Sequence, residues 1–97
     1  MNFPLSEFTW FVDLARGNAT FTLAKALKAA AKIFEWVSGI VPNDDEVIAR
    51  STEYDETRAV AEVENLIASH QGGTGAQAAM NIDWMLVIQL ILKALQR

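Results

Sequence analysis

The sequence predicts an all-α protein, an irregular bundle of four to five helices with the C-terminal helix central, folded as a single domain over residues 1–97. Three observations support this fold class. Apolar residues recur at helical i, i+3, i+4 spacing, and no useful stretch alternates as a strand would. Only five glycines and two prolines interrupt the chain. Hydrophobic residues make up 52% and charged residues 21%, as expected for a globular domain.

The first helix is bounded by its sequence. Pro4 suits a first helical turn, apolar residues follow at helical spacing, and Gly17 with Asn18 ends the pattern. Phe3, Trp10 and Leu14 lie off the main apolar stripe. The helix is therefore apolar over much of its circumference, and we expect it to lie between neighbours or to contribute to a contact surface.

A second, amphipathic helix is expected from about residue 19 to residue 38, before Gly39 and Pro42. Its expected core face is formed by Leu23, Leu27, Ala30, Phe34 and Val37, with Ala26, Ile33, Trp36 and Ile40 widening it. The opposite side carries a solvated basic ridge, which we define as Lys25, Lys28 and Lys32.

The third helix should begin near Asn43, where Glu46 follows three residues later in the arrangement of an N-cap with first-turn acids. Thr52 and Asp55 repeat that arrangement, so a kink or restart is expected within residues 51–54. Beyond it, Val60, Val63 and Ile67 give a core face.

Residues 76–95 predict one long final helix, with Thr74 and Gln77 as its capping box. Two apolar stripes run along it, and one small domain seldom buries both. The core stripe comprises Met80, Trp84, Val87, Ile88, Ile91, Ala94 and Leu95. The second stripe, with part of the first helix, predicts an interface made by Ile82, Leu86, Leu90, Trp10 and Leu14.

Several classes of protein are disfavoured. The final stretch has the length of a membrane span, but a central Asp or Lys costs roughly 2.5 to 3.5 kcal/mol in lipid, so no membrane span is expected. The net charge of −4 argues against a nucleic-acid binder. Without cysteine there is neither a disulfide nor a thiolate metal site. We expect no cofactor, and a soluble, cytoplasmic protein.

The acidic charge is concentrated between residues 44 and 64, a stretch that contains eight acidic residues and two arginines. The candidate acidic face comprises Glu53, Asp55, Glu56 and Glu62. A solvated helix face is the favoured interpretation. One alternative is an acidic inhibitor or adaptor that binds a basic protein through this face. A second is a hydrolase that holds Mg²⁺ with Glu53, Glu56, Glu62 and Asp83.

The other candidate residues favour structural roles. His70 is the only histidine, and its expected place in a polar loop at a helix end predicts interaction with the helix C-terminus rather than catalysis. No catalytic or metal-ligating set is predicted. The sequence therefore favours a small non-enzymatic protein that acts by association, as a homodimer or with a helical protein partner.

Overall fold

The computed structural model describes residues 2–40 and 53–96, and every regular element in those two ranges is an α-helix. The helices are α1 (Leu5–Ala15), α2 (Leu23–Ile40), α4 (Glu56–Gln71), α5 (Gly75–Asn81) and α6 (Trp84–Leu95). The predicted all-α class with four to five helices is confirmed. The predicted helix start at Asn43 lies outside the described residues, as does the first half of the predicted restart.

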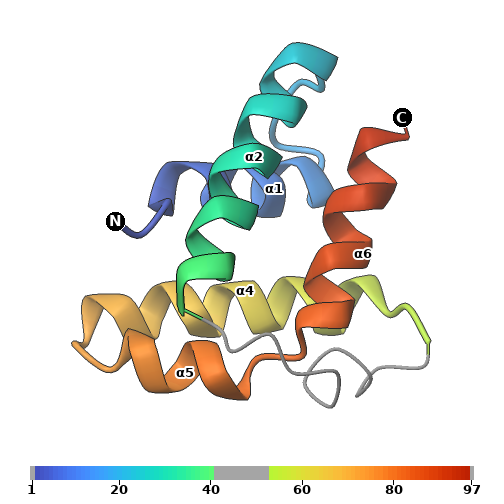
Figure 1. Cartoon of the computed structure of the whole chain (residues 1–97). Helices are drawn as coiled ribbons and strands as arrows, with labels where there is room; N and C mark the ends of the chain where they lie inside the picture. The colour runs from blue at the N-terminus through green and yellow to red at the C-terminus, as the bar shows by residue number, and fades with distance from the viewer. Residues whose placement is uncertain (1, 41–52, 97) are drawn as a thin grey trace.

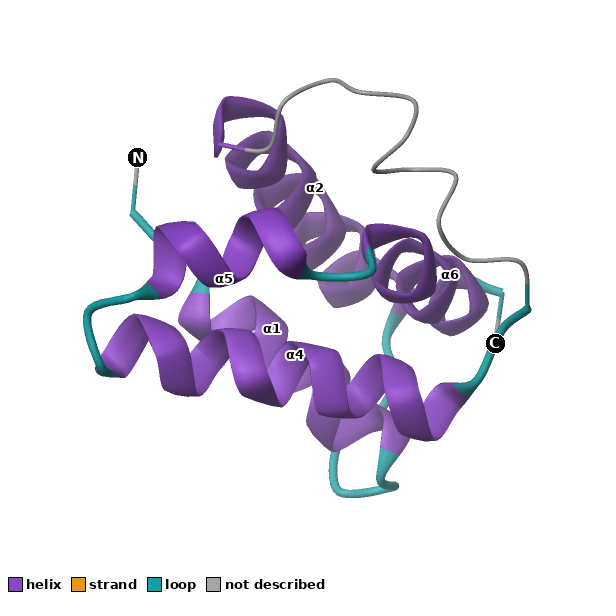
Figure 2. Ribbon diagram, turned by 90° about the horizontal axis from the view of Figure 1, so that it is seen from below, coloured by secondary structure: helices purple, strands orange, loops and turns teal. Residues whose placement is uncertain are grey.

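Helices α4 and α5 run side by side, and α2 and α6 stand across them (Figure 1). Helix α1 lies behind α2 in that view and packs against α2, α4 and α6. Viewed from below, α4 and α5 form the near layer of the molecule (Figure 2). The C-terminal helix α6 packs against α1, α2 and α4, which places it at the centre as predicted. Helices α1 and α4 share that position, because they pack against each other as well as against α6.

Helix α1 has the bounds that its sequence predicts. Pro4 precedes its first residue, and Gly17, with φ of +77°, takes the left-handed conformation that ends it. Its buried side chains cover most of its circumference and are Phe8, Trp10, Phe11, Val12 and Leu14. Arg16 at its C-terminal end pairs with Glu64 of α4 at 2.6 Å. The helix is therefore wedged between its neighbours.

The predicted core face of α2 is only partly right: four of its residues, Ala26, Ala30, Ile33 and Trp36, are buried, but the buried face is rotated about the helix axis. The buried residues are Ala26, Ala29, Ala30, Ile33 and Trp36. Leu23 and Leu27, each 54% exposed, and Phe34, 36% exposed, lie at the surface instead. The buried face thus combines three alanines with Ile33 and Trp36, and it leaves the other large apolar residues outside. Val37 is half-buried.

The prediction of one continuous helix over residues 76–95 is also wrong. The stretch forms α5 and α6, bent by 85°, with Ile82 in an extended conformation between them. Thr74 occupies the N-cap position of α5, but its side chain makes no capping hydrogen bond, so the predicted capping box does not form. None of the described helices is by itself long and apolar enough to cross a membrane, although the bent pair passes that test jointly.

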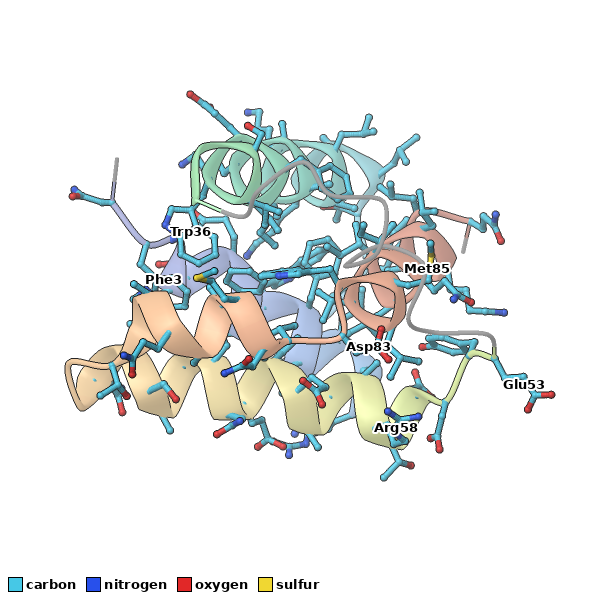
Figure 3. All side chains as sticks on the ribbon, turned by 60° about the horizontal axis from the view of Figure 1, so that its bottom comes forward. Phe3, Trp36, Glu53, Arg58, Asp83 and Met85 are labelled. Atoms are coloured by element: carbon cyan, nitrogen blue, oxygen red, sulfur yellow. The ribbon has the colours of Figure 1, made fainter. Side chains whose placement is uncertain are left out.

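His70 closes the end of α4 within an aromatic cluster. Its ring stacks on Phe3 with centroids 3.8 Å apart and meets the edge of Trp36 at 5.4 Å (Figure 3 labels both partners). Its Nδ1 lies 3.3 Å from the carbonyl oxygen of Leu66, one turn earlier in α4. The predicted contact with the C-terminal end of its helix is thus confirmed. Gly75, the first residue of α5, lies directly against this ring.

The contact between Gly75 and His70 gives the first testable prediction. A Cβ added at Gly75 would fall within the His70 ring, so we expect Gly75→Ala to lower the free energy of unfolding by about 1 to 3 kcal/mol through overpacking. Gly39→Ala is the matched control, because a Cβ in that helical position meets no atom within 4 Å. We expect it to be neutral or stabilising by about 0.5 to 1 kcal/mol.

Urea denaturation followed by circular dichroism measures both changes. The double variant Gly75→Ala with His70→Ala should recover part of the loss, because the colliding ring is gone. Equal stability of the two alanine variants would contradict the predicted packing of α5 on His70.

Candidate functional site

The break between α5 and α6 is built by polar groups on both sides of Ile82. The Asp83 carboxylate accepts a hydrogen bond from the backbone N–H of Leu86 at 3.4 Å and so caps α6. The buried Trp84 indole donates to the carbonyl oxygen of Ala79 at 2.7 Å, which satisfies a terminal acceptor of α5. Both helix ends at the break are therefore provided with partners, and the bend is a specified feature of the fold.

Helix α4 holds this break from outside. The Glu62 carboxylate accepts a hydrogen bond from the backbone N–H of Asp83 at 3.4 Å, and Arg58 lies 3.7 Å from the Asp83 carboxylate. Figure 3 shows Arg58 and Asp83 reaching toward each other between α4 and the start of α6. The side chain of Asp83 is 13% exposed, whereas that of Arg58 is 60% exposed. The cluster joins α4 to the α5–α6 junction.

The predicted interface had an incorrect premise, which was that the second stripe of the final helix remains uncovered. The 85° bend turns that stripe into the chain's own core. All five predicted residues are buried within one copy, with exposures of 1% for Ile82, 0% for Leu86, 4% for Leu90, 8% for Trp10 and 3% for Leu14. None of them offers a large free apolar surface. Trp10 also borders an open groove, which is described below.

The predicted acidic face is divided between structural and surface positions. The Asp55 side chain accepts a hydrogen bond from the backbone N–H of Arg58 at 3.2 Å and caps α4, and Glu62 faces the α5–α6 break. Glu53 and Glu56 are exposed, and Figure 3 shows Glu53 reaching away from the fold. Within the described ranges, no three His, Asp or Glu side chains are grouped so that they could hold a metal ion.

An open groove lies between α1 and α2. Its volume is about 470 Å³, within the range of ligand-binding clefts. Trp10 and Ala29 give it an apolar floor, because both are buried core residues that also line the groove. The three residues of the basic ridge line it as well, with Glu7 of α1 as the acidic member. The lining therefore carries a net charge of +2.

Two contacts organise this basic groove. The Lys25 ammonium lies over the Trp10 ring, 5.5 Å from its centroid, in a cation–π arrangement. The Lys32 ammonium lies 3.6 Å from the Glu7 carboxylate, across the gap between α2 and α1. Lys28 lies between these two positions along α2, and its side chain is exposed. The ridge is thus the charged wall of a groove and not only a solvated helix face.

The other flank of α2 carries an apolar stripe that we define as Leu23, Leu27 and Phe34. These residues are 54%, 54% and 36% exposed, although leucine and phenylalanine are usually buried. At 100° per residue they lie within about 40° of one another around the helix. Ala31 is exposed beside them. The three residues of the stripe therefore lie along one flank of the helix.

Comparison with known proteins shows that no family model, no curated protein and no solved structure matches this chain.

The Asp83 cluster gives a second testable prediction. We expect Asp83→Ala to lower the free energy of unfolding by about 0.5 to 2 kcal/mol, because α6 loses its N-cap. Asp83→Asn keeps a capping oxygen and loses only the charge pair with Arg58, so its cost should not exceed about 1 kcal/mol. Chemical denaturation separates the two variants, and an Asp83→Asn loss as large as that of Asp83→Ala would show that the ion pair, not the cap, holds the break.

Proposed function

We propose that this protein is a small non-enzymatic association module that forms a homodimer through the apolar stripe of α2. The observation that carries the proposal is the exposure of Leu23, Leu27 and Phe34 on one flank of a helix whose core face is already buried. Exposed apolar side chains that are contiguous mark interaction sites more often than isolated ones do. The functional class is the one expected from the sequence, but the surface is a different one.

The geometry of the stripe suits a second copy of itself. Leu23 and Phe34 are eleven residues apart, which corresponds to about 16 Å along a helix. In an antiparallel pair of α2 helices, Phe34 of one copy would lie against Leu23 of the other, and the two Leu27 side chains would flank the centre. A two-fold axis brings identical patches together in this way. The exposed Ala31 next to the stripe would permit close approach of the two backbones.

The polar groups that were candidates for chemistry support a non-enzymatic role. No polar or charged residue is among the fully buried residues of the described ranges, whereas catalytic acids and bases are often buried. Asp55, Glu62 and Asp83 already cap helices or hold the α5–α6 break. These carboxylates therefore have structural partners and need no bound cation to explain their positions.

The dimer gives the third testable prediction. We expect Leu27→Glu to convert the protein to a monomer, because a charge at the centre of the apolar contact loses its hydration without gaining a partner. Glutamate is a good helix former, and surface substitutions generally change stability by less than about 0.5 kcal/mol, so the fold should persist. Light scattering coupled to size-exclusion chromatography measures the mass.

Leu92→Glu is the matched control. Leu92 is 46% exposed and lies on α6. Its replacement by glutamate introduces the same change of charge away from the stripe, so this variant should remain dimeric. A wild-type protein that is strictly monomeric at its highest soluble concentration would eliminate the proposal. Loss of the dimer in both variants would assign the effect to charge instead of the α2 stripe.

A further inference from the structure

The basic groove lies on the flank of α2 opposite to the apolar stripe and calls for a ligand of different chemistry. Its wall presents three ammonium groups against one carboxylate in a protein whose overall charge is −4. Positive charge is therefore concentrated here against the net charge of the chain. An anionic ligand would be attracted to this position and to few others.

The spacing of the lysines points to a helical ligand. Lys25, Lys28 and Lys32 are separated by three and four residues, so they rise along one side of α2 by about 4.5 and 6 Å. Side chains three and four residues apart lie on one face of a helix. An antiparallel helix with acidic residues at i, i+4 and i+7 would repeat these intervals in reverse order. It would also place its C-terminal end near the start of α2, where the helix dipoles attract.

The floor of the groove adds an apolar requirement. Trp10 is 8% exposed and Ala29 is 5% exposed, so both are covered almost entirely by the core, and the Lys25 ammonium lies over the indole. The floor therefore offers only a small apolar area, which one apolar residue beside the carboxylates of a ligand would cover. The groove lining runs from Thr22, directly before α2, to Lys32, about 15 Å, which is long enough for roughly three helical turns of the partner.

We infer that the groove between α1 and α2 binds an acidic amphipathic helix of a partner protein, whose carboxylates at i, i+4 and i+7 pair with Lys25, Lys28 and Lys32. Helix-in-groove docking of this kind is a recurrent mode of peptide recognition. Nucleic acid fits less well, because three lysines with no arginine can neutralise few phosphates. The inference shares with the proposed function the idea that the protein acts by association, but it does not require the dimer.

The experiment uses a fluorescein-labelled, alanine-based helical peptide of about 15 residues, the length at which isolated helices become marginally stable. It carries Glu at i, i+4 and i+7 with Leu on the adjacent face. A second peptide has the same composition with its glutamates distributed around the helix. Fluorescence anisotropy against the full chain should show binding of the first peptide, at least about tenfold weaker binding of the second, and weakening of both by salt.

Two single variants test the assignment to the groove. Lys28→Glu should weaken binding of the matched peptide about tenfold, because it places a like charge opposite a glutamate. Lys93→Glu is the control, because it changes the net charge equally at an exposed lysine of α6 outside the groove. It should leave the affinity within about twofold. Circular dichroism confirms that both variants are folded.

A third variant is expected to increase the affinity for the peptide. Glu7→Gln removes the only carboxylate of the lining and the partner of Lys32, which raises the charge of the groove from +2 to +3. We expect binding to tighten by about two- to fivefold. A substitution that merely disturbed the fold would weaken binding, so an increase in affinity separates the electrostatic explanation from a structural one.

The inference is overturned by any of four results: absence of peptide binding at low salt, equal binding of the two peptides, equal weakening by Lys28→Glu and Lys93→Glu, or tighter binding of a single-stranded oligonucleotide of the same length. The Leu27→Glu variant separates this inference from the dimer. We expect it to bind the peptide as the wild-type chain does, whether or not the stripe of α2 forms an interface.

Discussion

The bend at Ile82 and Asp83 is the constraint on which the rest of the fold depends. It converts an apolar stretch of twenty residues into two helices that take different partners, because α5 packs on α4 while α6 packs on α1, α2 and α4. A straight helix would present its two apolar stripes to opposite sides. With the bend, Ile82, Leu86 and Leu90 all enter the core. The Asp83 cap and the Trp84 indole satisfy the helix ends that the bend exposes.

The sequence contains a signal for this bend that can be interpreted in two ways. Asn81 and Asp83 can be interpreted as polar interruptions of one long helix, because isolated polar residues are common in amphipathic helices. Asp83 directly before the apolar run that begins at Trp84 is also the pattern of an N-cap. Periodicity alone cannot separate these interpretations, because a helix that restarts after two non-helical residues keeps nearly the same apolar spacing along the sequence. The choice depends on tertiary partners such as Glu62, twenty-one residues away.

Helices α1 and α2 also show which features the local sequence determines and which depend on tertiary packing. The bounds of α1 follow from Pro4 and Gly17, whose backbone preferences are local, and the sequence predicts them correctly. The buried face of α2 does not follow from the sequence, because apolar residues cover more than half of its circumference. Its buried face combines three alanines with Ile33 and Trp36, and the helix packs against α1 and α6, whereas Leu23, Leu27 and Phe34 remain outside. A hydrophobicity pattern identifies which residues are apolar, whereas close packing selects which of them are buried.

The rotation of α2 also explains why the candidate site was missed. With the predicted face, Leu23, Leu27 and Phe34 would be core, and the basic ridge would point directly into solvent opposite them. In the structure, the ridge turns toward α1 and meets Trp10, while the apolar stripe turns outward. The centres of these two surfaces are separated by roughly 150° around the helix axis. Side chains on one flank therefore do not cover the other.

Because the two surfaces lie on separate flanks, one α2 helix could contact two partners at the same time. In an antiparallel two-fold pair of α2 helices, the apolar stripes face the axis, so the lysines of each copy point away from it. Both basic grooves would then remain open, one on each side of the dimer. Two grooves linked in this way would bind a partner carrying two acidic helices with a raised effective concentration, without any change of conformation in either copy. The rotation of a single helix thus accounts for both surfaces.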